Sequence, residues 1–143
     1  MTLGRTKGVD ILVSDPNGAR MIRLEVKTNY RSTRSTGGNS KVFGKFVSAW
    51  MMGTKHEQVR GPNLFYCFVN ISEYTKQFRF YILPSAVVSD YVRAQHQLWL
   101  DDRSSHSREN TLRIFRIGTR GAKYPIPAPI DEDYEDNWDS LRG

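Results

Sequence analysis

One turn signal between two alternating segments constrains the fold of this chain more than any other feature. In VDILVSDPNGARMIRLEVKT, residues 9–28, apolar and polar residues alternate on both sides of the tripeptide PNG. Alternation with a period of two is typical of half-buried strands, and Asn followed by Gly favours a two-residue type I′ turn. The segment therefore predicts a β-hairpin with Asn17 and Gly18 at its centre.

A two-residue turn at Asn17 and Gly18 fixes the register of this hairpin and places Asp10 directly opposite Glu25. Like charges at such positions are destabilising, because the Cβ atoms of opposed residues are only about 4.5–5.5 Å apart. Lys27 shares the face of Asp10 and Glu25, whereas the other face is uniformly apolar and comprises Ile11, Val13, Ile22, Leu24 and Val26. A loop of three or four residues would stagger the two carboxylates but leave them neighbours.

Two interpretations of this charged face remain open. Close carboxylates relieve their repulsion by protonation, by a base or by a divalent cation, and Mg²⁺ suits them because it prefers oxygen ligands and keeps positions for water and phosphate. An adjacent lysine could then orient or deprotonate an attacking water and stabilise developing charge. Alternatively, Lys27 only neutralises Glu25 on a solvated sheet face.

The pattern of these residues resembles a known family. The dipeptide VD, fourteen residues and then EVK are similar to the motif of the PD-(D/E)XK nuclease superfamily, with Val9 in place of the usual proline. The segment FYILPSAVVSDYV…HQLWL is similar to one found in small bacterial members, which are mostly uncharacterised. The resemblance covers approximately residues 8–100.

The resemblance implies both a fold and an activity. The expected fold is α/β (α+β), with a mixed central β-sheet flanked by helices, as in restriction endonucleases. The expected activity is the hydrolysis of phosphodiester bonds with Mg²⁺ as cofactor and Mn²⁺ as an alternative. Asp10 and Glu25 would bind the metal, the backbone carbonyl of Val26 would be a further ligand, and Lys27 would be the catalytic lysine.

The sequence departs from the family pattern at its start. Family members usually begin with a helix that often supplies a further acidic residue, but only nine residues precede Asp10 and none of them is acidic. We expect one of three explanations: a coding start placed too late, a homodimer or partner chain that supplies the missing element, or a degenerate site.

The charge distribution predicts a polyanionic partner. The net charge is +6, but residues 131–143 hold six of the 15 acids and one of the 21 bases, so the preceding residues carry 20 bases and nine acids. Such a basic body attracts nucleic acid, here DNA with RNA as an alternative. The candidate backbone-binding residues are Arg31, Arg34, Lys41 and Lys45, with interleaved aromatic side chains that either stack on bases or pack into the core.

The remaining sequence predicts a small α+β domain and a separate tail. Strands are expected at residues 63–71, 77–83 and 111–118, with a helix at 85–100, whereas residues 46–58 fit either a strand or a short helix. These elements form a single domain over residues 1–122. A Pro-rich and then acidic tail, residues 123–143, is expected to be an extended arm that lies off the core.

The sequence also indicates where the protein works and leaves three functions open. Without a signal peptide, a membrane-spanning segment or a second cysteine to pair with Cys67, a cytoplasmic protein is expected. The first function is a Mg²⁺-dependent endodeoxyribonuclease. The second is a non-catalytic nucleic-acid-binding module with a degenerate nuclease fold, and the third is an interaction subunit of a larger DNA-processing or defence assembly. His56, beside Lys55, is a weaker candidate for a group that approaches the site from a neighbouring strand.

Overall fold

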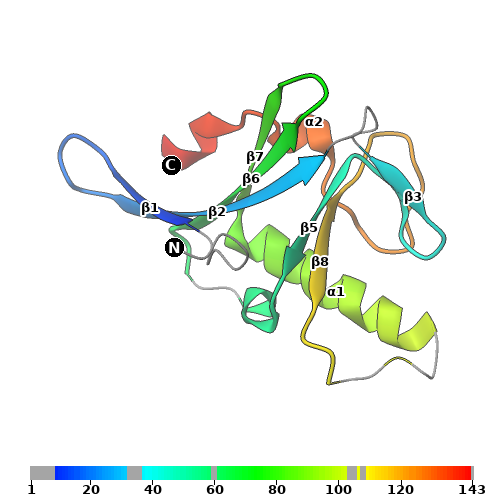
Figure 1. Cartoon of the computed structure of the whole chain (residues 1–143). Coiled ribbons are helices and arrows are strands. Elements are labelled where there is room, and N and C mark those ends of the chain that lie inside the picture. Colours follow the sequence, from blue (N-terminus) through cyan, green and yellow to red (C-terminus); the bar gives the residue numbers. More distant parts are fainter. Residues whose placement is uncertain (1–8, 32–36, 59–60, 103–105, 107–108, 143) are drawn as a thin grey trace, which may run out of the picture.

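A four-stranded mixed β-sheet forms the centre of the molecule, and one long helix packs on one side of it (Figure 1). The computed structural model describes residues 9–31, 37–58, 61–102, 106 and 109–142, and the side chains of residues 9, 10 and 31 lie outside the described part. The chain is thus α+β with few helices, and none of the helices in these ranges is long and apolar enough to cross a membrane. The strands and helices are β1 (Val9–Ser14), β2 (Met21–Arg31), β3 (Gly38–Ser40), β4 (Gly44–Phe46), β5 (Ser48–Met52), η2 (Thr54–Glu57), β6 (Leu64–Ser72), β7 (Phe78–Pro84), α1 (Ser85–Asp102), β8 (Arg113–Ile117), α2 (Asp131–Tyr134) and η3 (Trp138–Arg142).

The predicted hairpin register is confirmed, but the predicted turn type is wrong. β1 and β2 pair antiparallel with Asp10 opposite Glu25. The Gly18 amide donates to the Asp15 carbonyl at 3.0 Å, so the turn is centred on Pro16 and Asn17, and Gly18 follows with a φ of +68°. Proline favours the first central position of a type I turn, which explains the shift. The register is unchanged because the resulting four-residue loop, residues 16–19, is symmetric about the same midpoint as the predicted two-residue loop. The expectation that a four-residue loop would stagger the two carboxylates is therefore wrong.

The strand order of the central sheet is β1-β2-β6-β7, and only the β2–β6 pair is parallel. Because parallel neighbours need a long crossover, the chain forms β3, β4, β5 and η2 between β2 and β6. Residues 46–58, which fitted a strand or a helix, contain both: strand β5 and the single 3₁₀ turn η2. The other predicted strands and the helix are present at nearly the expected bounds.

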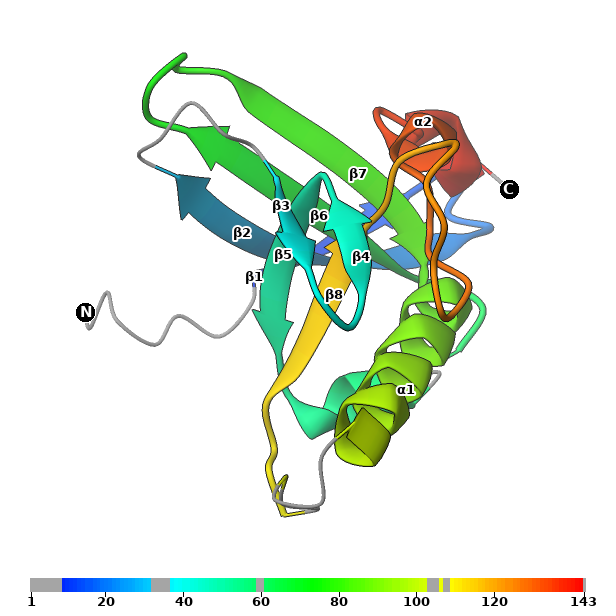
Figure 2. The same ribbon diagram turned by 90° about the vertical axis from the view of Figure 1, so that its right-hand side faces the viewer.

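The main core lies between the central sheet, α1 and the two-stranded sheet β5–β8 (Figure 2). Its centre is Trp50 on β5, which is buried, packs on Phe68 of β6 and Phe115 of β8, and donates its indole N–H to the Val69 carbonyl at 3.0 Å. Asn29 of β2 adds a polar link, because its amide donates to Ser48 Oγ at 2.7 Å and to the Ala49 carbonyl at 2.6 Å. These contacts fix β5, and therefore η2 after it, relative to β2.

A smaller core covers the other face of the sheet and corrects the expectation of an extended tail. It contains Cys67 and apolar side chains of β2, β6 and β7, and Leu141 from the C-terminal segment packs against it. Glu135 forms a bridge with Tyr81 of β7, and its carboxylate accepts two hydrogen bonds of 3.0 Å from Arg79. Glu135 thus has its partner on the chain's own sheet, and Arg20 of the hairpin donates a hydrogen bond of 3.1 Å to the Leu141 carbonyl, so residues 130–142 pack against β7 and the hairpin.

We expect that truncation after Pro129 destabilises the protein. The truncation removes the paired residues, the Arg79–Glu135 ion pair and the packing of Trp138 on Phe80, whose ring centroids are 5.7 Å apart. Because these contacts are lost together, we expect the free energy of unfolding to fall by roughly 2–4 kcal/mol. Urea denaturation measures this change. A control truncation after Leu141 removes only two residues and should leave the midpoint nearly unchanged. Equal midpoints for the two truncations would mean that the tail is the extended arm predicted from sequence.

Candidate active site

Three alternate residues of β2 carry polar side chains toward the side of the sheet that η2 and β5 cover. Glu25 is the register neighbour of Tyr66 on β6, and Asn29 that of Asn70. Because side chains of a strand alternate between faces, Glu25, Lys27 and Asn29 share one face, while Leu24 and Val26 face the smaller core. The prediction that Glu25 and Lys27 share a face is therefore confirmed.

The carboxylate of Glu25 is buried and is paired with two lysines. Its side chain is 2% exposed, and its Oε1 lies 3.8 Å from Lys27 Nζ and 3.4 Å from Lys55 Nζ. Removing a carboxylate from water is costly unless cations or hydrogen-bond donors compensate it, and the two ammonium groups do so here. The expected pairing of Lys27 with Glu25 is present, but sequence analysis missed Lys55, since no short-range spacing connects η2 to the middle of β2.

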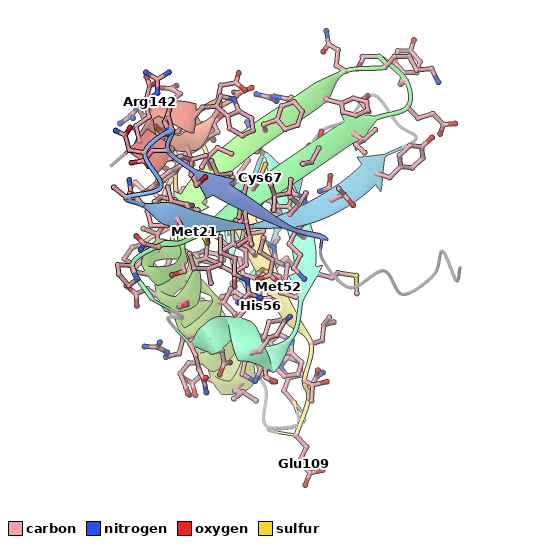
Figure 3. All side chains as sticks on the ribbon, turned by 90° about the vertical axis from the view of Figure 1, so that its left-hand side faces the viewer. Met21, Met52, His56, Cys67, Glu109 and Arg142 are labelled. Carbon is pink, nitrogen blue, oxygen red and sulfur yellow. The ribbon has the colours of Figure 1, made fainter. Side chains whose placement is uncertain are left out.

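His56, the residue after Lys55, anchors η2 against the sheet (Figure 3). Its imidazole is 1% exposed, and its Nδ1 lies 2.6 Å from the hydroxyl oxygen of Tyr66, the register neighbour of Glu25. The two rings also meet edge to face, with centroids 5.5 Å apart. His56 lies on η2 and not on a neighbouring strand, and its visible role is to position η2; its approach to the charged site stays a prediction.

Glu57 fixes the end of η2 against β8 and α1. Its carboxylate forms an ion pair with the buried guanidinium of Arg113 on β8, and its backbone carbonyl accepts a hydrogen bond of 2.7 Å from Arg93 of α1. The single turn of η2 is consequently held by the sheet, by β8 and by α1. Lys55 projects from a backbone that these three contacts immobilise.

The other predicted metal ligands are placed only in part. The backbone of Asp10 lies opposite Glu25 in the register, but its side chain is outside the described residues. Val26 lies within the sheet between Val9 of β1 and Cys67 of β6, and the proposed role of its carbonyl stays a prediction. Among the described side chains, no group of three or more His, Cys, Asp or Glu residues could hold a metal ion.

The predicted nucleic-acid-binding residues do not all lie on the strand of Glu25. Lys41 and Lys45 are exposed on the β3–β4 hairpin, which is a separate two-stranded sheet, whereas Arg34 and the side chain of Arg31 lie outside the described residues. Of the interleaved aromatic residues, Phe43 and Trp50 are buried, and Phe43 and Phe46 both pack on the Arg116 guanidinium. Tyr30, at the end of β2, is exposed.

Cys67 takes no part in the charged site. It points into the smaller core on the opposite face, and burial raises the pKa of its thiol to about 11. Because the thiolate is the nucleophilic form of cysteine, a thiol with this pKa is almost entirely protonated and inert near neutral pH. Cys67 is therefore a core residue.

Comparisons with protein-family models, with curated proteins and with solved structures found no match to this chain. A function must therefore be inferred from the residues and the geometry of the site. The most informative of these are a buried carboxylate on β2, a second carboxylate-bearing residue opposite it in the hairpin, and two lysines beside it.

The contact between His56 and Tyr66 can be tested by its contribution to stability. Tyr66→Phe removes the hydroxyl bonded to the buried imidazole, and we expect a loss of about 1–3 kcal/mol in the free energy of unfolding. Tyr81→Phe is a matched control, because the buried hydroxyl of Tyr81 has no hydrogen-bond partner among the described residues. That variant should be neutral or slightly stabilised in the same chemical denaturation experiment. Similar losses for both variants would show that the hydrogen bond to His56 does not fix η2.

Proposed function

We propose that this chain is a metal-dependent endonuclease that hydrolyses phosphodiester bonds in DNA and is built on a restriction-endonuclease-like fold. The observation that carries the proposal is the environment of Glu25. This carboxylate is buried, it lies opposite Asp10 in the hairpin register, and Lys27 is beside it on the same face. The resemblance to the Asp…Glu-x-Lys motif implies this arrangement of the three residues.

The chemistry of these donors fits a hard divalent cation such as Mg²⁺ or Mn²⁺. Such cations take oxygen ligands and leave coordination positions for water and phosphate. Asp10 and Glu25 would hold the ion, and the carbonyl of Val26 is a further ligand by the family resemblance. When bound, the ion supplies a Lewis acid that polarises a phosphate oxygen and generates a nucleophile from water at neutral pH.

Lys27 would contribute a fixed positive charge beside the reacting phosphate. Its side chain is 17% exposed and its Nζ lies 3.8 Å from Glu25, so the carboxylate limits where the ammonium can point. From this position it can donate hydrogen bonds to the attacking water or to a phosphate oxygen, on which negative charge increases in the transition state. Water attacks phosphorus in line with the leaving oxygen and gives up a proton to solvent; the bond between phosphorus and the leaving oxygen breaks, and that oxygen takes up a proton from solvent.

Plasmid cleavage tests this proposal directly. Wild-type protein should nick supercoiled DNA in Mg²⁺ or Mn²⁺ and should lose this activity in EDTA. Asp10→Asn, Glu25→Gln and Lys27→Met should each lower the cleavage rate by about 10²-fold or more, because each removes a group that acts on the transition state. Asp90→Asn, which changes an exposed carboxylate on α1, is the control and should cleave at the wild-type rate.

The proposal fails if wild type and the three site variants cleave alike, or if none of them cleaves DNA in either metal. Parallel reactions with single-stranded RNA determine which nucleic acid is the substrate.

A second candidate function, a non-catalytic nucleic-acid-binding module, is favoured by the two ion pairs of Glu25. Lys27 and Lys55 both lie within 4 Å of the same oxygen, so the buried charge is compensated by the chain's own residues. A carboxylate whose charge is compensated in this way needs no bound metal ion to be stable. The basic surface would then be the functional part of the molecule.

Binding in EDTA distinguishes the second candidate from the first. A binding module should show DNA affinity that falls steeply with salt, together with no cleavage in any metal. Replacing both exposed hairpin lysines, Lys41→Ala with Lys45→Ala, should reduce the slope of log affinity against log salt by about two, measured by fluorescence anisotropy. An unchanged slope would remove the β3–β4 hairpin from the binding surface.

A further inference from the structure

Lys55 differs from Lys27 in its freedom to leave Glu25. Both ammonium groups approach the same carboxylate oxygen, at 3.4 Å and 3.8 Å, but the Lys55 side chain is 60% exposed and that of Lys27 only 17%. Lys55 therefore lies on the solvent side of a carboxylate that is otherwise buried. A ligand that approaches Glu25 from the side of Lys55 must pass this side chain or displace it.

The backbone that carries Lys55 is fixed, so displacement involves its side chain alone. The next two residues anchor η2, His56 through Tyr66 of β6 and Glu57 through Arg113 of β8. A lysine has a long, flexible stem and a compact charge, which suits it to move between two anionic partners. Lys27 stays beside Glu25 when Lys55 leaves, and an ion pair with a partner as exposed as Lys55 is weak, at most about fivefold in an equilibrium constant, so leaving it costs little.

A divalent cation and the Lys55 ammonium would exclude each other electrostatically at Glu25. A divalent cation on this carboxylate would lie close to the present position of the Lys55 ammonium and repel it. A nucleic-acid phosphate brought to the same cation offers the ammonium a new anionic partner a short distance away. Lysine is a common point-charge ligand of phosphate.

We propose that Lys55 is a phosphate-positioning residue, which pairs with Glu25 in the free protein and moves to a phosphate oxygen of bound DNA when a divalent cation occupies Glu25. The inference rests on the proposed function and extends it by a residue outside the Asp…Glu-x-Lys pattern. Lys55 thus acts as a temporary counter-ion before the substrate arrives and as a backbone contact afterwards.

The first experiment measures metal binding without DNA. Lys55→Met keeps the length of the side chain and removes its charge, so Mn²⁺ should bind two- to about fivefold more tightly, as measured by calorimetric titration. Lys76→Asn is the matched control. It removes an exposed lysine from the β6–β7 turn, away from η2 (Figures 1 and 2), at a φ of +59° that Asn tolerates. The control should bind Mn²⁺ like wild type.

The second experiment measures DNA binding in Ca²⁺ with a short duplex. Lys55→Met should weaken binding and reduce the salt slope by about one, whereas Lys55→Arg should restore both because it keeps the charge. In cleavage assays Lys55→Met should raise KM and lower kcat only weakly. Wild-type-like Mn²⁺ affinity and salt slope in Lys55→Met would overturn the inference. If both binding effects appear while wild type cleaves no nucleic acid in any metal, the nuclease proposal fails and the role of Lys55 in binding stands.

Discussion

The negative charge of Glu25, buried in the middle of a strand, is the constraint around which this structure is organised. A carboxylate at 2% exposure needs cations beside it, and Lys27 supplies one from the same strand. The second comes from Lys55, which reaches Glu25 only because β5 crosses near β2 and the chain then turns into η2. The link from Asn29 to Ser48, the contact of His56 with Tyr66 and the Glu57–Arg113 pair all support that path. Stability and the candidate chemistry thus depend on the same contacts.

The parts of this arrangement that sequence could predict are local. The hairpin register followed from alternation and a turn signal, and it held although the turn is centred on Pro16 and Asn17, because a symmetric lengthening of the loop leaves every pair unchanged. Glu25 and Lys27 share a face by the period of the strand alone. The helix and the later strands were also predictable, since each carries its own periodicity or a run of aromatic and β-branched residues.

The parts that sequence could not predict depend on contacts between distant segments. Lys55 has no motif that relates it to Glu25, and the two meet only after a parallel crossover has formed. His56 is a buried hydrogen-bonding residue because Tyr66 lies across from it, not because of its own neighbours in the chain. The acidic tail looked separate from the core by composition. In the structure, however, Arg79 donates two hydrogen bonds to the Glu135 carboxylate, and Leu141 packs against the smaller core.

The docking of the C-terminal segment has a consequence for association between chains. β7 is an outer strand of the central sheet, and its free side is covered where Glu135 bridges Tyr81 and the amide of Asp136 donates to the Phe80 carbonyl at 2.8 Å. When this segment is detached, an otherwise complete sheet exposes an unpaired edge with aromatic side chains, which is a template for association with other chains. Detachment of the C-terminal segment and exposure of an aggregation-prone edge therefore coincide in this protein.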